Sequence, residues 1–190
     1  MFSLDETIIA RATPYGSGTR GILRLSGDDS VRVLRNIFHS KKEICDKNGR
    51  RIFSGDLMPW ETQQRFVPCD LYVWPSGYGY TGQLSVELHL WGSEPILDAV
   101  QRRILQSKQG TVRLAERGEF TLRAFLAGRL DLTQAEAVLG VIDAVDSKNL
   151  RVALDQLAGG IGHPLHRTQD DLLDTLSHLE IGRASCRERV

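Results

Sequence analysis

The sequence predicts an α+β fold, in which a mixed, largely antiparallel sheet with packed helices is followed by an all-α segment. Up to residue 118, short runs of strand composition alternate with glycine-rich turns and with two stretches of helical spacing. From Glu119 onward the apolar residues recur at helical spacing only. The chain has 190 residues, 41% hydrophobic and 25% charged, as in ordinary globular proteins.

The first two strands are expected at Thr7–Ala12 and Ile22–Leu25, on either side of the glycine-rich stretch Pro14–Gly21. A short amphipathic helix is expected next, because Asp28 and Asp29 are favourable N-cap residues. Its apolar face would consist of Val31, Leu34, Ile37 and Phe38. A polar loop should then cover residues 41–51.

Three more strands are expected at Ile52–Leu57, Leu71–Trp74 and Leu84–Leu90. The last of them alternates leucine or valine with polar residues, so one face belongs to the core and Glu87 points to the other. A second amphipathic helix is expected at Ile96–Leu105. These elements complete the first domain, residues 1–118.

Residues 119–180 are expected to form a helical segment. Thr133 and Glu136 form a capping box, which predicts the start of a helix there. The apolar spacing continues to Leu157, is interrupted by glycines and Pro164, and then resumes, which predicts two helices with a kink or break. Two such helices cannot bury all their apolar faces, so this helical domain looks incomplete. Residues 181–190 resemble a translated sequencing adaptor and are expected to be foreign sequence.

Composition excludes several classes of function. Lysine plus arginine equals aspartate plus glutamate at 24 each, so the net charge gives no reason to expect general polyanion or membrane binding. No apolar run approaches the ~20 residues that cross a bilayer, and the N-terminus lacks the pattern of a signal peptide, so a cytoplasmic protein is expected. Neither a metal site nor a disulfide is indicated by Cys45, Cys69 and Cys186.

Residues Gly16–Gly21 match GxGxxG, which binds a dinucleotide only where a helix follows the glycine turn. A strand is expected after Gly21, so a nucleotide-dependent oxidoreductase is a weak alternative. The sequence contains no GxxxxGK[ST] motif, and this chain should therefore have no P-loop GTPase activity alone. No nucleophile or paired carboxylate accompanies His89, His163 or His166, and no catalytic residue is assigned.

Several blocks, in order along the chain, are similar to those of the tRNA modification GTPases, the MnmE/TrmE family. The longest is Leu130–Val138, which Ile142–Ala144 follows. The others are Ile8–Pro14, Gly21–Gly27, Tyr80–Gly82, Val86–His89, Arg117–Thr121 and Arg123–Leu126. Such a series is far more specific than one short motif, and it covers about residues 5–180.

The resemblance implies an N-terminal domain that binds 5-formyl- or 5,10-methylene-tetrahydrofolate and forms a homodimer. It implies further that a helical domain carries an inserted GTPase domain, with GTP, Mg²⁺ and K⁺ bound only there, before which this chain stops. The full complex would modify the wobble uridine of tRNA with a carboxymethylaminomethyl group, together with a flavin-dependent partner subunit. The folate contacts implied by the family's pattern fall on Arg24, Glu87 and Arg129.

This sequence departs from the family's pattern at several positions. Arg129 stands where lysine is usual, Gln83 and Leu84 where the family shows Glu-Asp, and Ser93 where it shows glycine. These changes leave open an alternative, in which the chain is a stand-alone dimerisation or scaffold module with a decayed folate pocket. Arg24 and Glu87 would then simply lie on a solvated face of the sheet.

Overall fold

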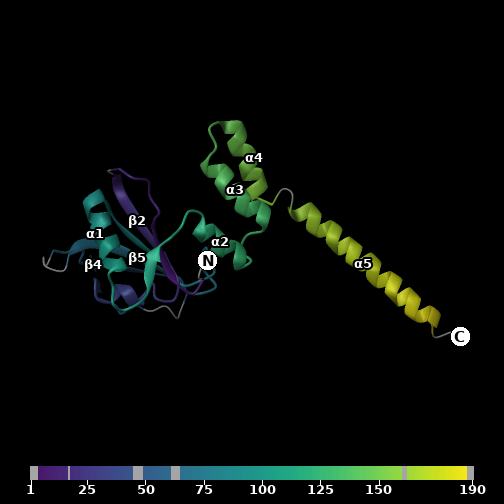
Figure 1. Cartoon of the computed structure of the whole chain (residues 1–190), viewed down its shortest axis with the longest axis horizontal. Helices are drawn as coiled ribbons and strands as arrows, with labels where there is room; N and C mark the ends of the chain where they lie inside the picture. Colours follow the sequence, from purple (N-terminus) through teal and green to yellow (C-terminus); the bar gives the residue numbers. More distant parts are fainter. Residues whose placement is uncertain (1–3, 17, 45–48, 61–64, 160–161, 188–190) are drawn as a thin grey trace. The chain divides into compact units, whose positions relative to one another are not determined.

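A computed structural model describes residues 4–16, 18–44, 49–60, 65–159 and 162–187 of the chain. The chain forms two compact units, residues 1–129 and 130–190 (Figure 1). Cys45 and the side chains of His163, His166 and Cys186 lie outside the described parts. None of the described helices is both long and apolar enough to span a membrane.

The first unit contains a seven-stranded sheet in the order β3-β4-β5-β6-β2-β1-β7. The neighbouring strands are antiparallel except for β1 and β7, which are parallel. The strands are β1 (Thr7–Arg11), β2 (Gly18–Ser26), β3 (Phe38–Ser40), β4 (Arg51–Leu57), β5 (Val67–Trp74), β6 (Ser85–Gly92) and β7 (Val112–Leu114). The prediction of an α+β fold with a largely antiparallel sheet is confirmed.

The core lies on one face of this sheet, where the strands present their alternate apolar residues. On that face, Leu23 and Leu25 of β2 adjoin Val86 and Leu88 of β6, and all four are fully buried. Helix α1 (Glu94–Leu105) closes the core with Leu97, Val100 and Ile104. A side chain at Gly21 would collide with Leu97, so α1 packs directly on β2.

Residues 31–38 do not form the expected helix, which corrects the sequence interpretation. A 3-10 turn, Arg32–Leu34, is followed directly by β3, whose Phe38 pairs with Leu57 of β4. Neither aspartate acts as an N-cap, because Asp29 instead accepts a hydrogen bond from the Thr111 N–H (3.0 Å). The pairing available at the edge of the sheet outweighs the local helical spacing.

Helix α2 (Glu119–Leu126) belongs to the sheet unit, since the contacts of the chain divide after Arg129. Gly118 precedes it with a φ of 74°, a left-handed conformation that favours glycine. The helix is anchored by its polar side: Glu119 and Arg123 are each only 2% exposed. Such buried charges require hydrogen-bond partners, which Glu119 and Arg123 find in each other and in residues of the sheet unit.

The second unit contains three helices, α3 (Leu132–Ile142), α4 (Ser147–Leu157) and α5 (Gly162–Arg187), rather than two with a kink. A new helix begins after Asp146, whose side chain caps α4 by accepting from Asn149 N (2.7 Å). The expected break near Gly159 does separate α4 from α5. The foreign origin of residues 181–190 stays a prediction.

The capping box of α3 is shifted from its predicted position. Asp131 is the N-cap and accepts from Gln134 N (2.7 Å), while the Gln134 side chain accepts from Asp131 N (3.0 Å). Gln134 also donates to the Leu157 carbonyl of α4 (3.1 Å). Thr133 lies inside the first turn, so the box that begins two residues earlier prevails.

Candidate functional site

Arg24 and Glu87 are direct cross-strand partners on β2 and β6, on the sheet face opposite the core. The Nε atom of Arg24 lies 2.7 Å from Oε1 of Glu87. The second carboxylate oxygen, Oε2, lies 2.9 Å from Nε2 of His89, one alternation further along β6. The strand register therefore brings the two predicted residues of opposite charge together, with Glu87 mostly buried and Arg24 partly exposed.

A cavity of about 440 Å³ opens beside this ion pair. Its volume lies within the range of small-molecule sites, about 300–1,000 Å³. Strands β2, β5 and β6, helix α2 and the loop before β6 all contribute to its wall. The lining residues are Arg24, Trp74, Tyr80, Thr81, Ser85, Glu87 and Phe120.

The aromatic part of the wall comes from three separate segments: Trp74 of β5, Tyr80 of the loop before β6 and Phe120 of α2. Phe120 of α2 lies under the Arg24 guanidinium, with 5.9 Å between the guanidinium carbon and the ring centre. The Tyr80 hydroxyl lies 3.3 Å from the Thr121 hydroxyl, which ties the loop to α2. A flat ligand in this cavity would meet aromatic surface and both signs of charge.

Arg129 does not line the cavity. Its Nη2 atom donates to the Gly77 carbonyl, and its Nε lies next to Gly82. Gly82 has a φ of 75°, and a β-carbon there would lie only 2.8 Å from that of Ala127. Of the three predicted contact residues, the structure therefore brings two together and places the third against the loop that supplies Tyr80 and Thr81.

Buried charges hold α2 against the sheet. Glu119 accepts two hydrogen bonds from Arg113 of β7 (2.7 and 2.8 Å) and one from Arg123 (3.0 Å). Burial raises the pKa of Glu119, but the hydrogen bonds from Arg113, Glu116 N and Arg123 outweigh it and lower the pKa to about 2. The carboxylate is thus ionised at neutral pH, and Arg113 also pairs with Glu6 (2.7 Å).

A chain of hydroxyl groups links this cluster to the cavity. Arg123 donates to Oε1 of Gln83 (2.8 Å), which also accepts from the Ser26 hydroxyl (3.2 Å). Ser26 Oγ lies 2.7 Å from Thr81 Oγ1, which in turn lies 3.2 Å from Ser85 Oγ. Gln83, one of the residues that depart from the family's pattern, therefore occupies the centre of a connected polar network.

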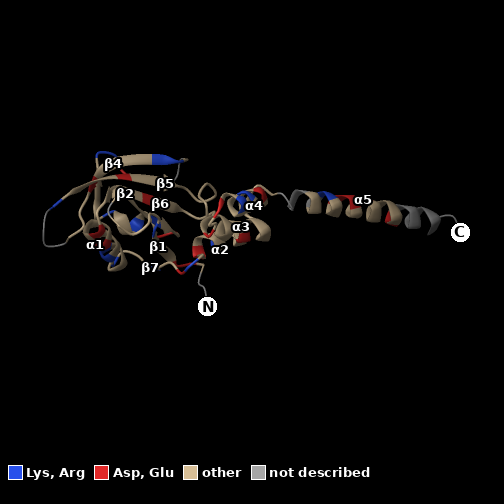
Figure 2. Ribbon diagram, turned by 90° about the horizontal axis from the view of Figure 1, so that it is seen from above, with Lys and Arg blue, Asp and Glu red and all other residues tan. Residues whose placement is uncertain are grey.

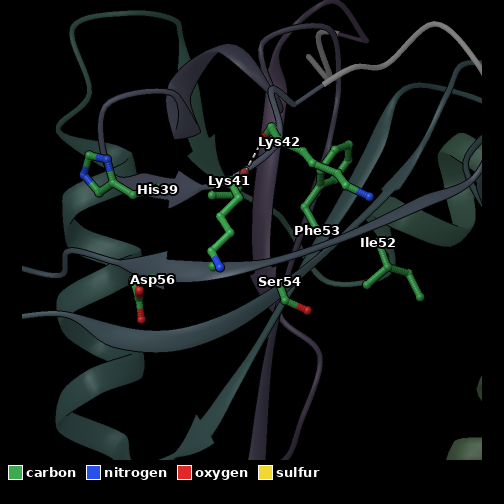
Figure 3. Close-up of a pocket in the computed structure, with 9 residues that line it drawn as sticks. His39, Lys41, Lys42, Ile52, Phe53, Ser54 and Asp56 are labelled. Carbon is green, nitrogen blue, oxygen red and sulfur yellow. Dashed lines mark hydrogen bonds between the residues drawn. The ribbon is translucent and has the colours of Figure 1, made fainter.

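A larger hollow of about 780 Å³ lies at the other edge of the sheet, over β3 and β4. Figure 3 shows the Lys41 side chain extending toward β4, which carries Ser54 and Asp56. None of the predicted contact residues lies there. The Arg24–Glu87 cavity is the stronger candidate because opposite charges, aromatic rings and buried hydroxyl groups converge on it.

Three further features bear on other kinds of site: metal-ligand clusters, the distribution of charge and the glycine motif. No group of three or more His, Cys, Asp or Glu residues among them is placed to hold a metal ion. Basic and acidic residues are interspersed over the sheet unit (Figure 2). Gly21 lies within β2, so a strand and not a helix continues from the glycine motif, against the dinucleotide-binding alternative.

Sequence reasoning missed most of the cavity wall, namely Trp74, Tyr80, Thr81, Ser85 and Phe120. Two signals for them were present. Tyr80, Thr81 and Phe120 belong to the family-like blocks, and Ser85 shares its alternation with Glu87. Trp74 carries no such signal, because its role depends on the β5–β6 register, in which it pairs with Ser85.

The architecture and this cavity together define an α+β domain with a charged, aromatic-walled cavity at a cross-strand ion pair. Residues 7–129 match the family described as GTP-binding protein TrmE N-terminus, and the chain belongs to this family. It is 45% identical over 179 residues to the tRNA modification GTPase MnmE of Rhodopirellula baltica, and 36% identical over 180 residues to that of Alkaliphilus metalliredigens. These alignments cover 94% of this chain but only 37% and 38% of the relatives.

Proposed function

We propose that the sheet unit binds 5-formyl- or 5,10-methylene-tetrahydrofolate in the Arg24–Glu87 cavity. The observation that carries the proposal is the ion pair itself. Glu87 uses one oxygen for Arg24 and the other for His89, and each carboxylate oxygen has a further lone pair for a ligand N–H. The pterin edge of a folate offers such N–H groups.

The rest of the cavity fits the same ligand. Arg24 contacts Glu87 through Nε, so its Nη groups would be the donors for carbonyl or carboxylate oxygens of the ligand. Phe120 and Trp74 supply apolar surface for a flat ring. Arg129 would act on the ligand by holding the loop at Gly77 or, after a change of side-chain conformation, directly. When bound, the folate would supply a one-carbon unit.

We propose the family's wider role for the whole protein, of which this chain matches little more than a third of the relatives' length. That role is modification of the wobble uridine of tRNA to its carboxymethylaminomethyl form, in the cytoplasm, with a flavin-dependent partner subunit. GTP, Mg²⁺ and K⁺ would bind in a part of the protein that this chain does not contain. Of the predicted helical segment, residues 119–180, α2 belongs to the sheet unit, and the helices after Arg129 would be the first ones of the helical domain.

Homodimerisation through the sheet unit is part of this proposal. Ile52 of β4 and Trp91 of β6 are 60% and 64% exposed, and burial of such large apolar side chains would stabilise an association. A second copy of the unit would cover them. Sedimentation of the chain should show a dimer that Trp91→Asp weakens, and a monomer at all concentrations would contradict this part.

The decisive test is calorimetric titration of 5-formyltetrahydrofolate into the whole chain and into Arg24→Ala. Loss of a charge-assisted contact should weaken binding by roughly 1.5–3 kcal/mol. Arg20→Ala is the matched control, because Arg20 lies on the same strand but does not line this cavity. If Arg24→Ala binds the folate as tightly as the unaltered chain does, Arg24 has no role in binding and simply lies on a solvated face of the sheet.

The alternative is a dimerisation or scaffold module whose pocket has lost its ligand, motivated by Gln83, Leu84 and Ser93. The contacts of Gln83 argue against a loss of the pocket at that position. Its amide oxygen accepts from Ser26 and Arg123, and its amide nitrogen donates to the Leu4 carbonyl. Absence of binding at millimolar ligand would nevertheless favour the scaffold.

A further inference from the structure

The orientation of the Gln83 amide is fixed by its neighbours. Its Oε1 lies 2.8 Å from Arg123 Nη1, which can only donate, and its Nε2 lies 3.0 Å from the Leu4 carbonyl, which can only accept. The reversed amide would place donor against donor and acceptor against acceptor. Gln83 therefore presents an acceptor to the hydroxyl chain that begins at Ser26.

This orientation determines where the hydroxyl protons go. Ser26 donates to Gln83 Oε1, which leaves Ser26 Oγ to accept from Thr81 (2.7 Å). Thr81 Oγ1 itself accepts from the Gln83 N–H (3.4 Å). The protons of both hydroxyl groups are thus used within this chain, because Thr81 donates to Ser26 and Ser26 donates to Gln83 Oε1.

Ser85 completes the chain at the cavity wall. Its hydroxyl donates to the Gln83 carbonyl (3.1 Å), a group that can only accept, and its other neighbour is Thr81. The Ser85 proton is therefore held within the protein, and the side toward the cavity carries a lone pair. Ser85 is 7% exposed and lines the same cavity as Glu87, two residues further on the same face of β6.

We propose that Ser85 is a specificity-determining residue of the cavity, held as a hydrogen-bond acceptor so that it and Glu87 together select a heterocycle with N–H donors along one edge. The inference rests on the proposed function and adds the chemical class of the recognised edge. A ring with a carbonyl at that edge would place its oxygen against two acceptors and is disfavoured.

The Gln83 departure does not alter this hydrogen-bond pattern. Glutamate, which the family's pattern shows at this position, would also offer an acceptor to Arg123 and Ser26. The amide keeps this acceptor and adds a donor for the Leu4 carbonyl. The direction of the hydroxyl chain, and with it the acceptor at Ser85, is independent of this replacement.

The experiment compares two flat pteridines: pterin, which carries an exocyclic amino group at C2, and lumazine, which carries a carbonyl there and an additional N–H at the adjacent N1. Binding to the whole chain is measured by calorimetry. The unaltered chain should prefer pterin by about tenfold, the worth of one net hydrogen bond and one avoided clash. Ser85→Ala should lose most of this preference, and Ser85→Cys, which keeps the volume but accepts weakly, should lose it too.

Ser54→Ala is the control, because Ser54 lies on β4 of the same sheet, is hydrogen-bonded to Asp70 and does not line the cavity. Unfolding midpoints of all variants show whether each protein is folded. If the chain binds 5-formyltetrahydrofolate but Ser85→Ala keeps the full preference for pterin, the role of Ser85 is overturned and folate binding stands. If neither a pteridine nor the folate binds, the proposed function fails, and the assignment of Ser85 fails with it.

Discussion

Replacing Glu119 by glutamine tests whether the buried charges hold α2 against the sheet. The carboxylate accepts hydrogen bonds from Arg113, Arg123 and Glu116 N within 3.0 Å, and the residue is 2% exposed. Removing one partner of a buried ion pair leaves uncompensated charge and costs about 3–5 kcal/mol. The lowered pKa gives a similar figure, about 3 kcal/mol, at roughly 1.4 kcal/mol per unit.

The effect should also depend on pH with a defined sign. Because the pKa of Glu119 falls from 4.5 to about 2 on folding, its contribution is complete above pH 4.5 and is lost as the pH falls toward 2. The difference in unfolding free energy between the unaltered chain and Glu119→Gln should therefore shrink over this interval. Glu94→Gln should have a smaller effect, because the Glu94 side chain in the pair with Arg11 is 34% exposed and water can replace part of the lost contact.

Tryptophan fluorescence during urea unfolding is a suitable assay, because all three tryptophans, at positions 60, 74 and 91, lie in the sheet unit. The midpoint of Glu119→Gln should move to clearly lower urea at pH 7 with little change in slope. A variant that unfolds at the same urea concentration as the unaltered chain would show that the cluster contributes no net stability, and the argument for α2 would fail.

Three further predictions concern single positions. Burial, with Asp70 adding a smaller effect, raises the pKa of Cys69 to about 12, so a thiol reagent at pH 8 should modify it only after urea unfolds the chain; modification of folded protein would contradict this. Asp131→Ala removes the capping box of α3 and should cost about 1 kcal/mol, measured as lost helical circular dichroism on mild heating. Gly82→Ala should destabilise the sheet unit by about 1–3 kcal/mol, which serine at that position would not relieve.

The fold was predictable where the local pattern and the tertiary environment agree. The five longer strands and α1 overlap their predicted positions, because alternation along β6 and helical spacing in α1 both coincide with burial. However, β2 begins at Gly18, inside the predicted glycine-rich loop, and β5 begins at Val67, each four residues before the predicted start. Strands β3 and β7 were not, since each has three residues and exists only through its partner. The same competition turned the apolar residues after Val31 into a 3-10 turn and an edge strand.

For the candidate site too, the local pattern predicts some features, and the tertiary structure alone determines the others. Alternation places Glu87 on the open face, but the contact with Arg24 depends on the β2–β6 register, which no local signal determines. The family resemblance supplied both residues, and it also supplied Arg129, which lies at the loop rather than in the cavity wall. The ring of Phe120 reaches the cavity only because Glu119 and Arg123 anchor α2.

Strand order has a consequence for synthesis on the ribosome. The first strand leaves the ribosome early but pairs with β7, more than a hundred residues later, and the carbonyls of Leu4 and Glu6 bond Gln83 and Arg123. The edge of β1 that pairs with β7, and the carbonyls of Leu4 and Glu6, therefore lack their hydrogen-bond partners until the segment through α2 has been synthesised. Deleting Leu4–Glu6, which removes these two carbonyls, would therefore disturb a network assembled from sequence far downstream.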